Sequence, residues 1–280
     1  MKVTAFNDFV CPIDGLALVQ GAKALSCRKG HVFDLAREGY CNLLLVQQKG
    51  SLDPGDNKEM VAARRRFLDG GYFEPIADKL FAMIPREKNL RIVDAGCGEG
   101  YYLNRLSESA KWDKRSNSLA LAGCDVSKWA VKAAAKRFPD IAWTVAGNKH
   151  LPFAPGSVDL IVSMFGYPDW KNFKPLLSQA GCVLLVDPGP QHLIELREII
   201  YPEVNVNDAP STNAAIENGY ILKREEPLRF SVGLSHTSIQ DLLAMTPHAF
   251  RIKKEARQRL QALKQLTVTV EVIFRILQVG

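Results

Sequence analysis

The stretch whose residue types best suit ligand binding runs from Asp94 to Gly100, in the order Asp-Ala-Gly-Cys-Gly-Glu-Gly, after the apolar run Leu90–Val93. Glycines in such a turn permit sharp bends and let a ligand approach the main chain. A dinucleotide fingerprint would read G-x-G-x-x-G, with its phosphates on a helix N-terminus, whereas this loop places an acid at Glu99. Because an acidic loop repels phosphate, we predict a site for a cationic nucleoside cofactor. The alternative is an ordinary turn between a strand and a helix.

A second acid follows a second apolar run. Asp125 ends the run Leu119–Cys124 and precedes helix-forming residues that begin at Lys128. At the end of the second strand of a nucleotide-binding fold, such an acid accepts hydrogen bonds from the ribose hydroxyls. We therefore predict a ribose contact, while a cap for the following helix is the alternative role.

Potential metal ligands gather near the N-terminus, where Cys11 and Asp14 precede Cys27 and His31. Two close pairs of ligands on turns are typical of a structural zinc site, although the second ligand of the first pair is more often a cysteine. Cys41 could supply a ligand in place of Asp14, and the module could also hold together without metal. We predict zinc bound by Cys11, Asp14, Cys27 and His31.

The length and composition of the chain limit its domain number, the class of its partner and its compartment. The chain has 280 residues, 47% of them hydrophobic, a net charge of +6 and six cysteines. This length allows one large α/β domain and one small domain, and the positive charge favours a polyanionic partner. No apolar run reaches the length of a membrane span, and the first residues lack the pattern of a signal peptide, so we expect a cytoplasmic protein with reduced cysteines.

The elements that would position these residues divide the chain in two. Asp53-Pro-Gly-Asp56 marks a turn between a module at residues 1–50 and a larger domain at residues 51–280. A helical segment at residues 56–85 leads into alternating strand and helix patterns. Two late β patterns, Leu228–Gly233 and Val268–Leu277, could form a closing antiparallel hairpin.

The glycine loop resembles motif I of class I S-adenosylmethionine-dependent methyltransferases, and the chain as a whole is similar to the RlmA family. The residues that carry this resemblance are Cys11-Pro, Cys27-x3-His31, Glu38-Gly-Tyr-x-Asn-Leu-Leu44, Asp53-Pro-Gly-Asp56, Ala63–Asp69, Asp94–Tyr102, Asp125–Arg137, Leu151-Pro-Phe153 and Pro188-Gly-Pro-x-His192-Leu. The resemblance implies a Rossmann-like α/β fold with a mixed seven-stranded sheet, preceded by a zinc-ribbon-like RNA-binding module. It also implies methylation of guanine N1 in a hairpin loop of 23S ribosomal RNA, with S-adenosylmethionine as cofactor.

The same resemblance assigns residues to roles. The implied cofactor contacts are Phe73, Asp94, Gly96, Cys97, Gly98, Glu99, Gly100, Asp125, Asn148 and His192. The chain departs from the family pattern at Asp14, at Asp187, and at Gly71-Tyr72-Phe73, which replaces a stretch where the family has a tyrosine against the cofactor. Phe73 would keep a stacking contact but not a hydroxyl bond.

Acceptor chemistry adds further candidates. Guanine N1 carries a proton that must be accepted during methylation, for which we predict Asp187 or His192. Phe165 and Tyr167 could stack on an unstacked guanine, or could simply pack at a strand end. The predicted phosphate contacts are Arg28, Lys29, Arg64 and Arg65.

A homodimer is possible. Two other functions remain open from sequence, a small-molecule methyltransferase and a non-catalytic RNA-binding protein.

Overall fold

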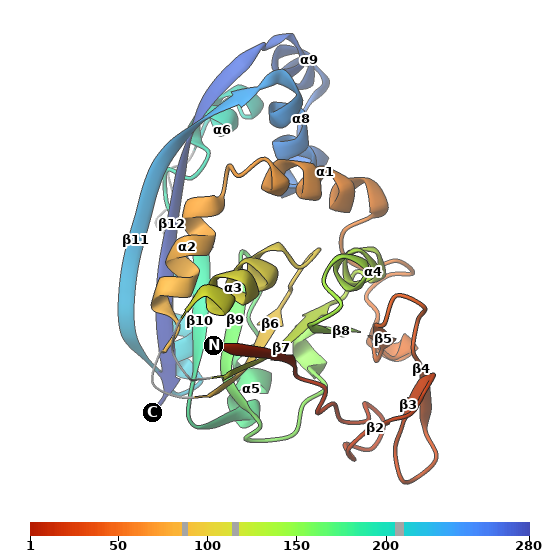
Figure 1. Ribbon diagram of the computed structural model, residues 1–280. Coiled ribbons are helices and arrows are strands. Elements are labelled where there is room, and N and C mark those ends of the chain that lie inside the picture. Colours follow the sequence, from red (N-terminus) through yellow and green to blue (C-terminus); the bar gives the residue numbers. More distant parts are fainter. Residues whose placement is uncertain (86–88, 114–117, 205–209) are drawn as a thin grey trace.

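A mixed sheet forms the centre of the molecule (Figure 1). The computed structural model describes residues 1–85, 89–113, 118–204 and 210–280. Seven strands follow the order β8-β7-β6-β9-β10-β12-β11, in which β12 runs antiparallel to both of its neighbours. These strands are β6 (Leu90–Ala95), β7 (Ser118–Asp125), β8 (Ala142–Val145), β9 (Val158–Met164), β10 (Leu177–Pro188), β11 (Tyr220–Ser235) and β12 (Gln265–Val279). Strand order reverses beside β6, so the loop after β6 lies at the topological switch point, where α/β sheets bind ligands. The predicted fold is confirmed.

Two short strands enlarge the predicted seven-stranded sheet to nine. β1 (Lys2–Ala5) pairs with the first half of β7, and β5 (Cys41–Asn42) pairs with β8. The rest of the N-terminal region forms a separate three-stranded sheet from β2 (Val19–Gln20), β3 (Ala24–Ser26) and β4 (Val32–Asp34). The first 50 residues are therefore joined to the large sheet at two places.

Helices cover both faces of the sheet (Figure 1). One core contains Leu80 of α2 (Glu74–Met83), Leu106 of α3 (Tyr101–Trp112) and Val131 of α4 (Lys128–Arg137). The opposite core contains Phe173 of α5 (Trp170–Phe173) and Ala215 of α7 (Asn213–Glu217). Burying a large apolar side chain contributes about 1.5–3 kcal/mol to the stability of the fold. The two cores therefore hold the strands, and with them the strand ends that carry the site, in fixed positions. Short 3-10 turns are η1 (Val46–Gln48), η2 (Asn148–His150), η3 (Lys174–Leu176) and η4 (Pro247–Phe250).

The predicted helical segment at residues 56–85 comprises α1 (Lys58–Asp69) and α2. Packed against α1 is a helical insertion, residues 236–264, which contains α8 (His236–Ala244), η4 and α9 (Lys254–Ala262) and separates β11 from β12. Arg66 forms an ion pair with the buried Asp241, and the Tyr72 hydroxyl bonds Ser238 at 2.7 Å. These contacts hold the insertion against the segment that leads into the sheet. α6 (Ile194–Ile200) packs near α9.

Candidate cofactor site and zinc centre

The glycine loop after β6 is held by backbone hydrogen bonds to the end of β7. The Gly96 and Cys97 amides both donate to the Cys124 carbonyl, at 2.8 and 3.0 Å. Gly96 has φ +90°, and a Cβ placed on it would meet nothing within 4 Å, so free space adjoins the main chain there. By contrast, a Cβ on Gly100 would lie 2.6 Å from Trp143, so this glycine is required by packing. The loop thus presents bare backbone toward open space.

Asp94 lies under this loop and is 1% exposed. One of its carboxyl oxygens, Oδ1, has no hydrogen-bond partner among the described residues. Burial raises the pKa of Asp94 to about 7, with a further contribution from the nearby Asp125. A buried oxygen without a partner is costly, and a cationic group bound beside Gly96 would remove that cost. This fits the predicted cationic cofactor.

Glu99 has a partner that the sequence did not reveal. Its carboxylate forms an ion pair with Arg137 of α4, while Oε1 has no partner among the described side chains. Burial raises the pKa of Glu99 to about 7, although Arg137 opposes that shift. Arg137 also bonds Asp69 at 2.7 Å. Glu99 therefore links the glycine loop to α4 and α1, and its contact with a cofactor stays a prediction.

Asp125 supports the loop from the neighbouring strand. Its Oδ2 accepts from the Gly98 amide at 2.9 Å, and its Oδ1 accepts from the Ser127 amide at 2.7 Å. The residue that caps α4 is Ser127, whose hydroxyl accepts from Ala130. The alternative role of Asp125 as helix cap is therefore wrong. Its ribose contact stays a prediction, with a position at the strand end that suits it.

An aromatic group lies at the ends of β9 and β10. Phe165 has its ring centroid 6.5 Å from Phe73, 6.4 Å from Tyr102 and 5.9 Å from His192. Phe165 is 37% exposed and has φ +54°, a conformation that is strained for a side chain of this size and is often stored at functional sites. Tyr102 of α3, whose buried hydroxyl has no partner among the described groups, was not among the predicted site residues. Tyr167 is 90% exposed, and Asn148 donates to its carbonyl.

The two predicted proton acceptors have different surroundings. Nδ1 of His192 accepts from the Glu271 amide at 3.3 Å, and burial lowers the pKa of His192 to about 4. The ring is therefore neutral near pH 7, with its proton on Nε2, which makes it a poor base but a possible donor. Asp187 is buried against Arg275 at 3.0 Å. Arg275 in turn bonds Glu225, so this carboxylate belongs to a network across three strands.

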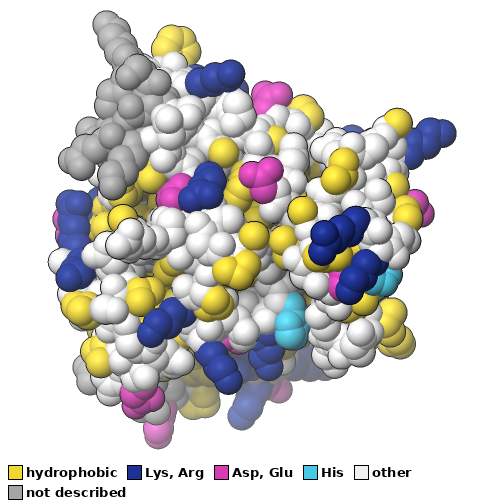
Figure 2. Space-filling view, turned by 90° about the horizontal axis from the view of Figure 1, so that it is seen from below, with side chains coloured by type: hydrophobic (Ala, Val, Ile, Leu, Met, Phe, Trp, Pro, Cys, Tyr) yellow, Lys and Arg dark blue, Asp and Glu magenta, His cyan; other side chains and the backbone are white. Residues whose placement is uncertain are grey.

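The predicted phosphate contacts differ in the exposure of their side chains and in their ion pairs. Arg28 and Lys29 are exposed on the turn between Cys27 and His31. Arg64 pairs with Asp56 at 2.8 Å and lies against Gly98, which places it beside the glycine loop. Arg65 is half exposed and 3.5 Å from Asp69. On the face seen in Figure 2, basic side chains are spread out and do not form a single patch among the residues drawn in colour.

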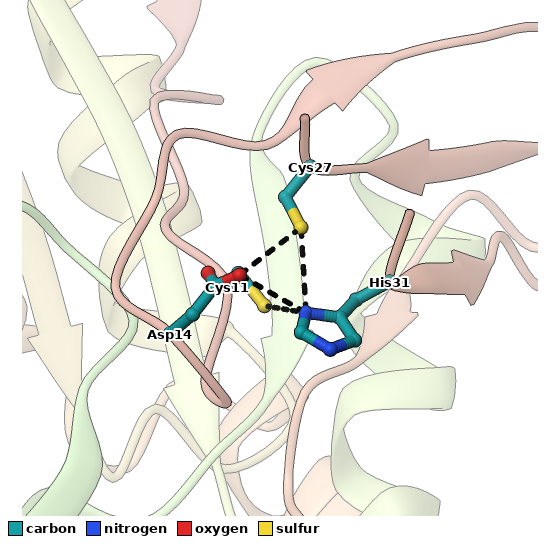
Figure 3. A group of neighbouring side chains, drawn as sticks. All are labelled: Cys11, Asp14, Cys27 and His31. Carbon is teal, nitrogen blue, oxygen red and sulfur yellow. Dashed lines mark hydrogen bonds and ion pairs between the residues drawn. The ribbon is translucent and has the colours of Figure 1, made fainter. Parts of the chain in front are cut away.

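The four predicted zinc ligands meet at one point (Figure 3). Their ligand atoms all lie within 4.8 Å of one another. His31 Nδ1 is 3.5 Å from Cys11 Sγ, 3.4 Å from Cys27 Sγ and 3.1 Å from Asp14 Oδ2. A tetrahedral zinc ion with bonds of about 2.0–2.3 Å would hold its ligand atoms about 3.3–3.8 Å apart. The donor set therefore fits zinc, as do the distances from His31 to the two sulfurs, and the distance from His31 to Asp14 is slightly shorter than this range.

Cys41 lies outside this group. Its thiol donates to the Phe33 carbonyl at 3.8 Å, and burial raises the pKa of Cys41 to about 12. All six cysteines are buried and free. Replacement of Asp14 by Cys41 as the fourth ligand is therefore not supported.

Two substitutions of Asp14 test its role as a ligand. We expect Asp14→Cys to bind zinc more tightly, because a thiolate is a softer ligand than a carboxylate. We expect Asp14→Ala to bind zinc more weakly by over roughly 10- to 100-fold, which is the loss typical of a residue that only hydrogen-bonds to a metal ligand. Zinc affinity is measured by competition with a chromophoric chelator. Equal affinity of Asp14→Ala and the parent protein would show that Asp14 is not a ligand.

Comparison with known proteins identifies both parts of the chain. The family model described as RlmA, N-terminal matches residues 9–52, and a methyltransferase domain matches residues 92–200. The chain is 33% identical to a Bacillus subtilis protein provisionally named 23S rRNA (guanine-N(1)-)-methyltransferase YxjB, over 97% of this chain and 98% of that protein. It is 30% identical to the 23S rRNA (guanine(748)-N(1))-methyltransferase of Streptomyces fradiae, over 95% of each. Among solved structures, YcgJ of Bacillus subtilis has a TM-score of 0.47 and 16% identity, covering 73% of this chain and 98% of its own.

Proposed function

The chain belongs to the RlmA family of 23S rRNA (guanine-N1)-methyltransferases, and we propose that it methylates N1 of a guanine in a hairpin loop of 23S ribosomal RNA. The observation that carries this proposal is the unpartnered, buried Asp94 oxygen under an open glycine loop at the switch point of the sheet. The zinc-ribbon region, residues 1–50, would contribute to RNA binding. The cytoplasm is the compartment that this substrate requires.

When bound, S-adenosylmethionine supplies an electrophilic methyl group on its sulfonium. Asp94 would hold the amino group of the cofactor and Asp125 its ribose, with Asn148 near the adenine. These contacts would hold the cofactor so that its methyl group can reach the acceptor nitrogen, and such positioning supplies much of the rate in a displacement reaction. Glu99, through Arg137 and α4, keeps the loop in place.

The aromatic group would position the acceptor. Phe165, at the end of β9, offers a ring face for an unstacked guanine, with Phe73 and His192 behind it. The neutral His192 would donate its Nε2 proton to an acceptor atom of the base. Asp187 is paired with Arg275, and His192 is a weak base. Burial raises the pKa of Asp187 although Arg275 opposes that shift, so Asp187 is the stronger base of the two and stays the predicted acceptor of the N1 proton.

Cofactor binding should depend on pH through Asp94. In the free protein the pKa of Asp94 is raised to about 7, and a bound ammonium group would lower it. Binding therefore releases a proton, and affinity should fall as pH decreases below about 7, approaching tenfold per unit. Calorimetry between pH 5.5 and 8.5, in buffers of different ionisation enthalpy, measures both effects.

The matched variant is Asp94→Asn, which should bind S-adenosylmethionine weakly and lose this pH dependence. A pH-independent affinity in the parent protein would contradict the assignment of Asp94 to the amino group. Failure of the parent protein to bind S-adenosylmethionine at all would favour a non-catalytic RNA-binding protein.

A small-molecule methyltransferase is the second candidate. The four-ligand zinc group argues against it, because methylation of a small acceptor has no need of an appended ribbon with exposed Arg28 and Lys29. A homodimer stays a prediction, which light scattering would check. No helix in the described part of the chain is long and apolar enough to cross a membrane.

A further inference from the structure

The helical insertion, residues 236–264, concentrates positive charge. It contains two acidic residues, Asp241 and Glu255, and six basic ones, which gives +4 of the net +6 of the chain. Asp241 is buried and paired with Arg66, which lies outside the insertion. The basic side chains are all exposed and are Arg251, Lys253, Lys254, Arg257, Arg259 and Lys264. About a tenth of the chain therefore carries most of its net charge.

A groove of about 340 Å³ lies between this insertion and the start of α1. Phe250 and Arg257 line one side, and Asn57, Glu59 and Met60 line the other. Phe250 is 74% exposed, so its ring is accessible to a ligand in the groove. The groove offers an aromatic face, a guanidinium and a carboxylate that can accept from base N–H groups.

The groove adjoins the cofactor site. Met60 precedes Arg64 by about one helical turn, roughly 6 Å along α1, and Arg64 lies against Gly98 and donates to the Met245 carbonyl at the end of α8. On its other side the insertion contacts the end of α6 through His248, which bonds the Tyr201 hydroxyl at 2.8 Å. Figure 1 shows the insertion at the opposite end of the molecule from the zinc-binding sheet β2–β4.

We propose that Phe250, Arg251, Lys253, Lys254 and Arg257 bind the single-stranded RNA that flanks the target guanine, with one base stacked on Phe250 in the groove. This inference rests on the proposed function. Proteins bind unpaired RNA with aromatic rings beside basic side chains, and the surface has both. The RNA would then contact the enzyme on two sides of the active site, the zinc ribbon and the insertion.

The test uses the zinc-loaded protein and an unmodified 23S rRNA transcript, with binding measured over a range of salt concentrations. Lys253→Gln combined with Lys254→Gln should weaken binding at least tenfold. It should also make the slope of log K against log salt shallower by about 1.4, as expected for two lost single-strand phosphate contacts. Phe250→Ala should weaken binding about tenfold with an unchanged salt slope. The KM for RNA should rise in both, while S-adenosylmethionine affinity and kcat stay within twofold.

The control is Lys171→Gln combined with Lys223→Gln, two exposed lysines on α5 and β11, away from the groove. This pair should leave RNA binding within twofold of the parent. Unchanged RNA binding and an unchanged salt slope in the insertion variants would overturn the inference. An equal loss of binding in the control would also overturn it, because binding would then depend only on the net charge of the protein. Absence of methylation by the parent protein would instead contradict the proposed function, and the binding data would still decide the inference.

Discussion

Replacement of Asp125 by alanine is expected to weaken S-adenosylmethionine binding at least a hundredfold. Two hydrogen bonds from ribose hydroxyls to a carboxylate contribute about 1.5–3 kcal/mol each, and about 1.4 kcal/mol corresponds to tenfold. The same carboxylate holds the Gly98 amide at 2.9 Å, so the loop also loses an anchor. Calorimetric titration with S-adenosylmethionine measures the effect, and kcat/KM for the cofactor should fall in parallel.

Ser127→Ala separates this role from helix capping. Ser127 caps α4 next to Asp125, so its loss should lower the unfolding free energy by about 1 kcal/mol. Cofactor affinity should change less than fivefold. An Asp125→Ala protein with affinity within threefold of the parent would show that Asp125 does not contact the cofactor, whatever its effect on stability.

Loss of a zinc ligand should abolish RNA methylation and spare cofactor binding. In Cys27→Ala the remaining three ligands cannot complete the tetrahedron, and structural zinc supplies much of the folding free energy of a small ribbon. We expect a zinc content near zero and kcat/KM for 23S rRNA at least a hundredfold lower. The affinity for S-adenosylmethionine should stay within twofold, since the glycine loop belongs to the large sheet. Elemental analysis, an RNA methylation assay and calorimetry give the three values.

Cys41→Ala is the matched control, because Cys41 is a buried cysteine of the same module outside the ligand group. It should retain about one zinc per chain and methylate RNA. Deletion of residues 1–50 is a poorer test, since β1 and β5 pair with β7 and β8 of the large sheet. Normal RNA methylation by zinc-free Cys27→Ala would reject a role for the metal in RNA binding.

The sequence predicted the large sheet because its strands are long and apolar and are separated by turn residues. It did not predict that β1 and β5 join that sheet. These strands are four and two residues long, and β5 pairs with Thr144 and Val145, about a hundred residues away. Periodicity over so few residues identifies neither a strand nor its partner. The closing hairpin was expected, although β11 and β12 extend well beyond the predicted β patterns.

Site residues could be predicted from sequence where they belong to one short motif. The four zinc ligands are two local pairs, and the predicted meeting of these pairs is confirmed by their geometry. The surroundings of Glu99 were not predictable, because its partner Arg137 lies at the end of α4, 38 residues further along the chain. The same holds for His192, whose weak basicity results from burial among elements that are distant in the sequence.

Incubation of the protein with methyl-labelled S-adenosylmethionine and unmodified 23S rRNA tests the central claim most directly. The modified position is mapped by mass spectrometry of nuclease fragments and by reverse-transcription stops, since a methyl group on N1 blocks base pairing. We predict one labelled guanine, methylated on N1, in a hairpin loop. Cofactor binding without label on any guanine N1 of naked RNA or of ribosomal particles would contradict the account.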